Sequence, residues 1–394
     1  MSLRGFATAS ARREFTLLRT RPWDLAMITW VPLLAAALMW WIFSAGLPTR
    51  LPIGVLDQDH SALSRQVVRF LEATPGLRVA QHYDDETAMA RALVRGEVDA
   101  AVHLPRNLAR EIKQGRAGRV VLLHNAQLGT HSGLIQRDVR TAVGTVSAGI
   151  ELTARNKRGE SMTAARASME PVRASTVSLF NTSLDYEQFL GAALIPAVLH
   201  ILAMTAGAWA VGRELRDRRI DEWIGAAPRW HEALAALAGK LALPFAGLTL
   251  AAMLAMLWIT AGRGWHPAGS LGWTLFALAV FLALSIALGA FAAALTRSLR
   301  TALSATGFIT APAFAFGGVG FPLLAMPPLA RAWALLLPYT HYIRVQMEQL
   351  QMGAPLAYSV AAPLWMVLAT AALLAASAAL LARAATQPHT WGGR

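Results

Sequence analysis

The sequence contains no cysteine and few charged residues. Without cysteine, neither a disulfide framework nor a thiolate metal site can form. Charged residues make up 15% of the 394 residues, well below the roughly one quarter that is usual in soluble domains. Hydrophobic residues make up 55% and are clustered along the chain. This is more apolar sequence than a single globular core can bury.

A phosphate-binding loop is also missing. Such a loop needs a glycine, four further residues, and then Gly-Lys followed by serine or threonine. The only Gly-Lys pair is Gly239-Lys240, with Leu234 in place of the first glycine and Leu241 after the lysine. The chain therefore has no nucleotide-binding loop of this kind. If the chain takes part in transport, something other than a nucleotide bound at such a loop must supply the energy.

Metal and catalytic motifs are absent from the sequence as well. An EF-hand counted from Asp57 needs glycine at its sixth position, where Ala62 stands. No Gly-x-Ser-x-Gly elbow occurs. Four histidines of the polar region are scattered; they are His82, His103, His124 and His131. We therefore assign no catalytic residue and no metal ligand.

One stretch, Ile53–Ala73, remains a candidate for phosphoryl transfer. It places Asp57 and Asp59 directly after an apolar run, as some phosphoryl-transfer enzymes do. No distal lysine or further acidic cluster completes such a site. We therefore expect a structural role, in which Asp57 ends a strand and Asp59 or Ser61 caps a following helix.

Six apolar segments are long enough to cross a membrane, which takes roughly 20 residues in a helix. They are Leu25–Leu47, Phe189–Gly212, Leu234–Ala261, Leu271–Leu295, Ala302–Leu324 and Leu356–Leu381. The first is too long and too rich in tryptophan for a cleavable signal peptide. The sequence thus predicts a polytopic α-helical membrane protein with six transmembrane helices.

Arginine marks one side of these spans. It is abundant before the first span, between the second and third, between the fourth and fifth, and after the sixth. The short loop on the opposite side carries Arg263 alone. Because basic loops stay in the cytoplasm, we expect both termini to be cytoplasmic. The net charge of +13 then reflects membrane anchoring and lipid contact, and no nucleic-acid partner is expected.

The polar segment 48–187 lies between the first two spans and is expected outside the cytoplasm. Short apolar runs alternate in it with helical patterns, which predicts an extracytoplasmic α/β domain. Its long helical stretch, from Ser132 to about Arg158, has two interpretations. It is a core helix of the domain, or a helix that faces a partner, since glycines interrupt its apolar stripe.

Ionisable residues are rare within the spans. Lys240 lies near a cytoplasmic end, where its side chain can extend to the interface. His200 is the one candidate in the middle of a span. We expect it to hydrogen-bond to a neighbouring helix, because a single histidine is thin evidence for a proton relay.

The cytoplasmic loop Gly212–Ala242 combines dense charge with the apolar pair Trp223 and Ile224. A solvated turn with basic anchors would explain the arginines. It would not explain an apolar pair among charges, which favours docking to another protein.

This loop resembles the coupling segment of type-2 ATP-binding-cassette (ABC) exporter permeases. Arg-Glu after the second span, Glu-Trp-Ile and Ala-Pro match the family's pattern. Arg219-Ile220 stand where the family usually has Gly-Thr. The resemblance implies an ATPase-coupling role for Arg213, Glu214, Arg218, Asp221, Glu222, Trp223, Ile224 and Pro228.

A second resemblance lies between the last two spans, where the family carries Phe-Pro, Met-Pro and Leu-Pro signatures. It implies an outer re-entrant region over 320–355, with Phe321, Pro322, Met326, Pro327, Pro338 and Tyr339 as its signature residues. Proline breaks helices there, and irregular backbone at membrane depth must be covered by protein. The Asp-x-Asp-x-Ser start of the external domain is similar to the family's large-domain members.

The resemblance implies a permease subunit in a bacterial inner membrane, moving a hydrophobic or amphipathic substrate out of the cytoplasm or membrane. ATP and magnesium would be bound by separate ATPase subunits. Further partners would be a second permease copy, a periplasmic adaptor and membrane lipid. The expected parts are an amphipathic interface helix (1–23), the first span (24–47), the external domain (48–187), the remaining spans (188–382) with a coupling loop (213–232), and a cytoplasmic tail (383–394).

Two other classes of protein stay open. One is a mechanical or sensory membrane protein that moves its external domain but no substrate. The other is a membrane-anchored hydrolase that acts through Asp57 and Asp59.

Overall fold

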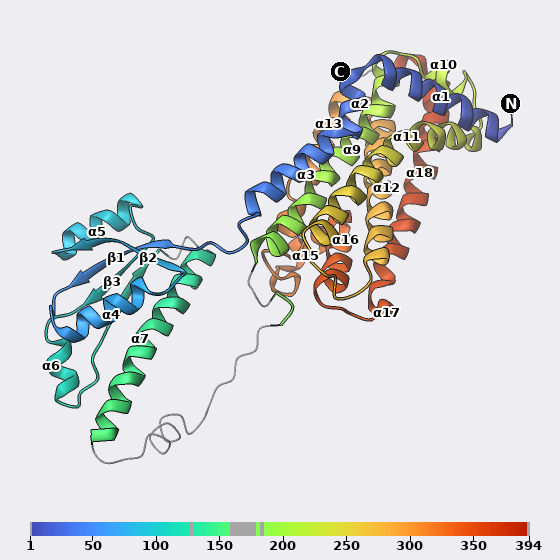
Figure 1. Ribbon diagram of the computed structural model, residues 1–394. Helices are drawn as coiled ribbons and strands as arrows, with labels where there is room; N and C mark the ends of the chain where they lie inside the picture. Colours follow the sequence, from blue (N-terminus) through green and yellow to red (C-terminus); the bar gives the residue numbers. More distant parts are fainter. Residues whose placement is uncertain (1, 126–128, 158–178, 182–184, 392–394) are drawn as a thin grey trace. The chain divides into compact units, whose positions relative to one another are not determined.

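The computed structural model describes residues 2–125, 129–157, 179–181 and 185–391 (Figure 1). The chain divides into two compact units. One comprises Met1–Gly46 and Ser178–Arg394, here called the helical unit, and the other, Leu47–Val177, is called the inserted unit. Each has a hydrophobic core of its own, so each is described by itself.

The inserted unit contains a four-stranded sheet. Its strands are β1 Leu51–Asp57, β2 Leu77–Tyr83, β3 Ala100–Leu104 and β4 Val121–His124. The spatial order is β2-β1-β3-β4. β1 pairs in parallel with β2 and β3, and β4 runs antiparallel to β3. All four strands lie where short apolar runs predict them.

Helices cover both faces of this sheet. They are α4 Ala62–Glu72, α5 Glu86–Arg95, α6 Leu108–Lys113 and α7 Gly129–Lys157. Alternate residues of β1 point to opposite sides, so Ile53 and Val55 pack with α4 and α7 while Leu56 packs with α5 (Figure 1). Five residues of α7 are buried in the first of these cores: Leu134, Ile135, Val139, Ala142 and Val146. Of the two interpretations of α7, the core helix is confirmed for this part of the helix.

The helical unit begins with α1 Leu3–Thr20, α2 Pro22–Ile28 and α3 Trp30–Phe43. After the inserted unit the chain continues through further helical segments. They are η2 Glu187–Gly191, α9 Ala192–Arg216, α10 Ile220–Ile224, α11 Trp230–Leu257, η3 Trp258–Gly262, α12 Leu271–Thr296, α13 Leu299–Thr310, α14 Ala313–Phe316, η4 Leu323–Ala325, α15 Pro328–Leu336, α16 Pro338–Gln346, η5 Met347–Gln351, α17 Leu356–Ser359, α18 Ala361–Ala385 and η6 Pro388–Thr390.

Among the described residues, four helices are long and apolar enough to cross a membrane. They are Glu187–Arg216, Trp230–Gly262, Leu271–Thr296 and Leu356–Ala385. A fifth candidate is the pair α2 and α3, which is bent by 46°. The structure therefore has four or five candidate spans, and the protein is a polytopic helical membrane protein.

The bend between α2 and α3 has a cause in the sequence. Pro32 lies in the first turn of α3 and has no N–H to donate to the carbonyl of Ile28, four residues earlier. Its ring also crowds that carbonyl. The helix therefore breaks at Thr29, whose backbone leaves the helical region at φ −121° and ψ −86°. The predicted first span, Leu25–Leu47, is a broken one.

The predicted fifth span, Ala302–Leu324, is wrong as a single helix. α13 ends at Thr310, and the short α14 ends at Phe316, before Gly318 with φ +87°. Pro312 and Pro322 lack backbone donors, and Gly318 takes a left-handed conformation that stops a helix. Apolar length alone predicted continuity there, but helix-breaking residues divide the segment.

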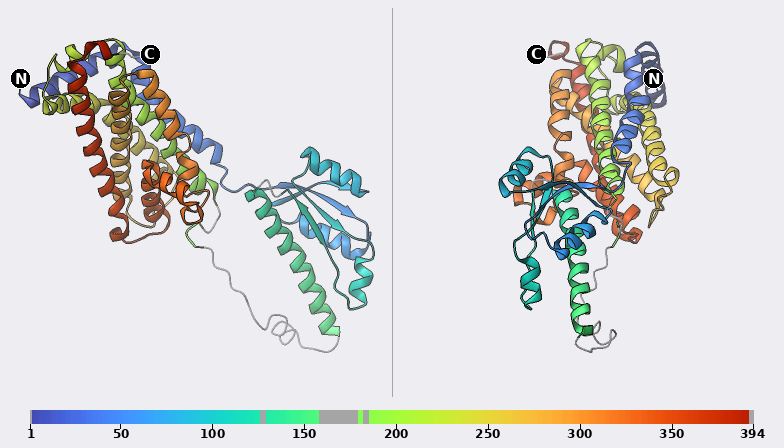
Figure 2. Two further views of the ribbon diagram at one scale, coloured as in Figure 1. Left: turned by 180° about the vertical axis from the view of Figure 1, so that it is seen from behind. Right: turned by 60° about the vertical axis from the view of Figure 1, so that its left-hand side comes forward.

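Helices α1 and α10 and the C-terminal end of α18 lie at one end of the helical unit (Figures 1 and 2). The short helices α15, α16 and α17 lie at the opposite end. The long helices α9, α11, α12 and α18 run between these two ends. We call them the terminal end and the α15–α16 end.

Candidate functional site

A cluster of charged side chains lies at the terminal end of the helical unit. Five of its members are buried: Glu14, Asp24, Arg213, Glu214 and Lys240. They come from α1, α2, α9 and α11. Arg13 and Glu222 lie at its rim. We call these seven residues the charge cluster.

Lys240 is the centre of the charge cluster. Its side chain is fully buried, and its Nζ lies 2.7 Å from Oε1 of Glu214 and 3.0 Å from Oε2 of Glu14. The expectation that Lys240 extends to the membrane surface is therefore wrong. Because a buried ammonium is costly without a partner, these two carboxylates fix α11 against α1 and α9.

Arg213 makes the second buried junction. It donates from Nη1 to Oδ2 of Asp24 at 2.9 Å and from Nη2 to Oε2 of Glu14. Glu14 thus accepts from α9 and is paired with Lys240 of α11 at the same oxygen. One carboxylate on α1 therefore links two membrane-crossing helices.

At the rim, ion pairs of Arg13 extend the network to α10. Arg13 lies 3.1 Å from Glu214 and 3.3 Å from the half-exposed Glu222. Arg219 donates to Glu222 at 2.7 Å and so holds the pKa of this carboxyl below its usual range. The seven residues comprise three cations and four carboxylates, and Arg219 supplies the fourth cation by pairing with Glu222.

The inward face of α1 differs from the amphipathic surface helix that the sequence predicts. Its buried residues are Ser10, Glu14 and Leu18, spaced by one turn each, and Phe15 is exposed. α1 is therefore held by polar and ionic contacts as well as by apolar packing.

Close backbone packing brings α1 onto α11. Gly239 faces the backbone of Ala7, and a Cβ at position 239 would lie 2.0 Å from the Ala7 carbonyl oxygen. No side chain fits there without moving a helix. Glycine at 239 thus allows Lys240, the next residue, to reach Glu14.

We expect Gly239→Ala to displace α1 and to increase hydrogen exchange throughout Leu3–Thr20. Gly307→Ala on α13 is the matched control, since nothing lies within 4 Å of a Cβ there and alanine favours helix by about 1 kcal/mol. Exchange measured by mass spectrometry should rise in the first variant only. Equal protection of α1 in both variants would contradict this packing.

Trp223 and Ile224 do not form an exposed docking pair, and this expectation is wrong. Both are buried in the core of the helical unit. Trp223 donates from Nε1 to Oγ of Ser10 at 2.7 Å, and Lys240 Nζ lies 4.8 Å from its ring centre. These residues attach α10 to the charge cluster. The exposed aromatic residue of this loop is Trp230.

The other loop residues predicted from the sequence divide into two groups. Arg213 and Glu214 are buried in the charge cluster. Arg218, Asp221 and Glu222 are exposed, and Pro228 is half-buried. The loop therefore has an inner part whose side chains are buried against the spans and an outer part whose charged side chains are exposed.

Sequence reasoning missed Ser10, Glu14 and Asp24 and gave Lys240 the wrong role. One signal was available for Glu14, which is the only acidic residue among the first 23 residues of an arginine-rich segment. An isolated carboxylate in a basic run favours an internal ion pair. Its partners could not be identified from the sequence, since they lie about 200 positions away.

The region 320–355 contains short helices and turns. α15 and α16 have 9 residues each and begin with proline. Phe321, Pro322 and Pro327 are exposed and Met326 is half-buried, whereas Pro338 and Tyr339 are buried. The signature residues therefore do not form one site. Re-entry into a membrane remains a prediction.

α16 is fastened to a proline in α9. Pro196 has no N–H, so the Ala192 carbonyl lacks its usual helical donor. Gln346 donates to that carbonyl from Nε2 at 2.8 Å, and the Tyr339 hydroxyl donates to Ala193 at 2.9 Å. The Gln346 side chain thus replaces the backbone bond that Pro196 removes from α9, and Tyr339 adds a contact at the next residue.

We expect Gln346→Met to lower the free energy of unfolding by about 1–3 kcal/mol, because a buried carbonyl is left unsatisfied. Adding Pro196→Ala supplies a backbone donor and should recover a large part of this loss. Thermal unfolding of the single and double variants measures it. If the stability losses of the two single variants simply added in the double variant, Gln346 would not be replacing the donor that Pro196 lacks.

His200 makes the interhelical contact predicted for it. Its Nδ1 lies 2.8 Å from Oγ of Ser285 on α12, and its ring packs against Phe281 at 5.3 Å. The prediction of a hydrogen bond to a neighbouring helix is confirmed.

The two aspartates of the inserted unit have structural partners. Asp57 accepts from the backbone N–H groups of Asp59 and His60 and from the Ser64 hydroxyl, and Asp59 accepts from Ala109 N–H on α6. Ser61 and Ser64 form a capping box at the start of α4. The predictions that Asp57 ends a strand and that Ser61 caps the following helix are therefore confirmed.

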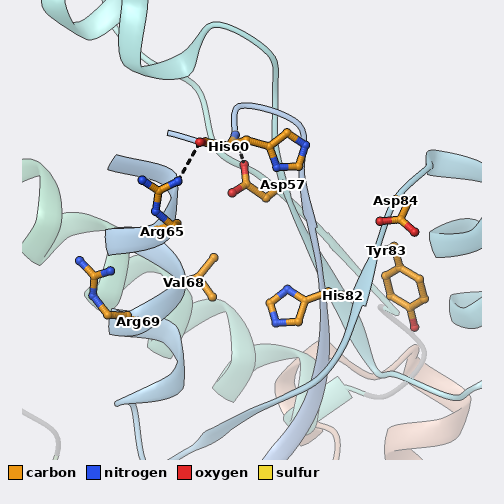
Figure 3. Close-up of a pocket in the computed structure, with 8 residues that line it drawn as sticks. All are labelled: Asp57, His60, Arg65, Val68, Arg69, His82, Tyr83 and Asp84. Carbon is orange, nitrogen blue, oxygen red and sulfur yellow. Dashed lines mark hydrogen bonds between the residues drawn. The ribbon is translucent and has the colours of Figure 1, made fainter. Parts of the chain in front are cut away.

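A hollow of about 370 Å³ lies beside Asp57 (Figure 3). Arg65, Arg69 and His82 line it from α4 and β2. Within the described ranges, no group of three or more His, Cys, Asp or Glu residues is placed to hold a metal ion. No arrangement of a phosphoryl-transfer site is visible around Asp57 and Asp59 in this part of the chain.

Comparison with known families places these observations in context. Residues 22–381 match the family model described as ABC-2 family transporter protein. No curated protein and no solved structure matches the chain significantly. The match includes α2, α3, three of the four long apolar helices and the fourth as far as Leu381, together with the buried charges of α9 and α11. The chain therefore belongs to the ABC-2 transporter family and is a membrane-spanning permease component of an ABC transporter, the partner of an ABC ATPase subunit.

Proposed function

We propose that this chain is the permease of an exporter in a bacterial inner membrane, with both termini in the cytoplasm. Two copies would pair with two ATPase subunits, which bind ATP and magnesium. The terminal end of the helical unit would face the ATPase. Arginine at this end supports the orientation, since basic segments stay on the cytoplasmic side.

The charge cluster is the observation that supports this proposal most directly. The exposed part of the loop, with Arg218, Asp221 and Glu222, would bind the ATPase. Glu222 is linked through Arg13 to Glu214, and Trp223 is linked to Ser10 and Lys240. A displacement of α10 would therefore move α1, α9 and α11 together. Coupling requires that the ATPase bind this loop differently in its two states.

The proposed substrate is hydrophobic or amphipathic. An apolar hollow of about 300 Å³ on the helical unit supports this class. Trp40 of α3, Ile195 of α9 and Trp258 of η3 are among its lining residues. Because a membrane helix exposes such surfaces to lipid, a cargo that partitions into the bilayer can reach it directly.

Reconstitution tests the proposal. The tagged chain would be purified with the ABC ATPase that accompanies it, then placed in liposomes containing a fluorescent phospholipid. We expect ATP, but not a non-hydrolysable analogue, to move the lipid to the leaflet opposite the ATPase. Movement toward the ATPase leaflet would contradict export. ATP hydrolysis without movement of this lipid or of fluorescent amphipathic dyes would favour the mechanical alternative.

A further inference from the structure

The inserted unit contains a long groove beside α7. Its floor is apolar and comes from three helices; the residues are Leu63, Val67, Leu108, Ile112, Val146 and Ile150. The segment 115–120 forms a wall. The volume is about 820 Å³, within the range of roughly 300–1,000 Å³ that is usual for small-molecule sites.

The groove is built into the unit. Val67, Leu108 and Val146 each have at most 3% of their surface exposed, so its floor is the core of the unit. Gly118 packs on α6 so closely that a Cβ there would lie 2.8 Å from Cδ1 of Leu108. This contact holds the wall in place beside the floor.

The groove is also elongated. A second hollow of about 500 Å³ shares Val120, Val143 and Ser147 with it. The two together follow α7 from Gln136 to Ala154, about 27 Å at 1.5 Å per residue. A long, narrow groove with an apolar floor and polar edges suits an extended alkyl chain with a polar head group better than a compact ring system.

The rim of the groove is basic. Arg116 and Arg119 line it, and both are exposed. Arg116 donates to the neutral amide of Gln114, which leaves its charge uncompensated. The acidic residue on the opposite wall, Glu151, is paired with Arg155 at 2.6 Å. An anionic group at this rim would therefore meet two guanidinium groups without a competing free carboxylate on the wall.

We propose that this groove binds a single-chain amphiphile with an anionic head group. The alkyl chain lies along the floor between α4, α6 and α7, and the head group contacts Arg116 and Arg119. Guanidinium groups bind carboxylate and phosphate oxygens through paired hydrogen bonds. The site is a property of the inserted unit and does not depend on the direction or existence of transport.

Photolabelling of the full-length chain in lipid nanodiscs tests this site. The probe is a palmitic acid analogue with a diazirine in the alkyl chain, and labelled peptides are mapped by mass spectrometry. We expect labelling within residues 108–154. Arg116→Glu combined with Arg119→Glu should reduce it about tenfold. Val143→Trp, which places a large ring where the two hollows meet, should reduce it to a similar extent.

Two controls separate the site from general partitioning into lipid. Arg91→Glu with Arg95→Glu makes the same charge change on α5, on the other face of the sheet, and should leave labelling unchanged. A fatty alcohol probe of the same length should label the groove more weakly and be insensitive to the arginine changes. Labelling confined to the membrane-crossing helices, or equal labelling of all variants, would overturn the proposal.

Discussion

Lys240→Met is expected to destabilise the chain by about 3–5 kcal/mol, because removing one partner of a buried ion pair leaves a charge uncompensated. Glu14 and Glu214 would lose the ammonium that lies 3.0 and 2.7 Å from them. α1 would lose its ionic contact with α11. Thermal unfolding of the purified chain and hydrogen exchange in Leu3–Thr20 should both report the change.

Charge balance provides the decisive comparison for this variant. Adding Glu214→Gln to Lys240→Met removes one negative charge as well and should recover more than half of the lost stability. Lys113→Met, at an exposed lysine of α6 in the inserted unit, should have little effect. If the double variant were as unstable as the sum of the two single variants, Lys240 and Glu214 would not act as a pair.

Reversing the two exposed acids of α10, Asp221→Lys with Glu222→Lys, is expected to reduce recovery of the ABC ATPase with the tagged chain by at least about tenfold. Surface charges that meet a complementary partner become repulsive when reversed. Glu222 loses its ion pairs with Arg13 and Arg219. Because these pairs are exposed to solvent, their loss should destabilise the chain only slightly. Quantitative co-purification measures the loss of the ATPase.

The matched control is Asp84→Lys with Glu86→Lys, two exposed acids of the inserted unit. It makes the same change in net charge and should leave ATPase recovery unchanged. If both double variants lost the ATPase equally, net charge would be responsible and α10 would not be the contact. If neither lost it, the outer part of the loop would not bind the ATPase.

Local patterns in the sequence predicted local structure well. The apolar run before Asp57 is β1, and Ser61 caps α4 as expected. Four of the six predicted spans coincide with long apolar helices. In each case the signal and the structure involve residues within a few turns of one another, so periodicity and capping chemistry were sufficient.

The charge cluster could not be predicted in the same way. Glu14 and Lys240 are paired across most of the chain, and no local pattern reports that pairing. The inward orientation of Trp223 depends on Ser10 and Lys240, which belong to two other helices. An apolar pair among charges indicates a contact, but the sequence does not say whether the contact is within the chain or with a partner.

Hydropathy also overestimated helix continuity. It ranked Ala302–Leu324 with the other spans, although Pro312 and Gly318 lie inside that segment. The bond between Gln346 and the Ala192 carbonyl was likewise unpredictable. Pro196 indicates that a backbone donor is missing in α9, but the side chain that supplies the replacement hydrogen bond comes from another helix.

Spin labels at Arg300→Cys on α13 and Arg331→Cys on α15 test the central claim, that α10 and the charge cluster carry ATPase motion to the membrane-crossing helices. Both positions are exposed, and the chain has no native cysteine to label. The distance between the labels is measured by pulsed electron paramagnetic resonance in the complex with its ATPase, with and without ATP and vanadate. The account predicts that ATP and vanadate change the distance between the labels in the protein with the native loop. In the variant that also carries Glu222→Ala and Trp223→Ala, the distance should stay unchanged while ATP hydrolysis continues. The same shift in both proteins would contradict it.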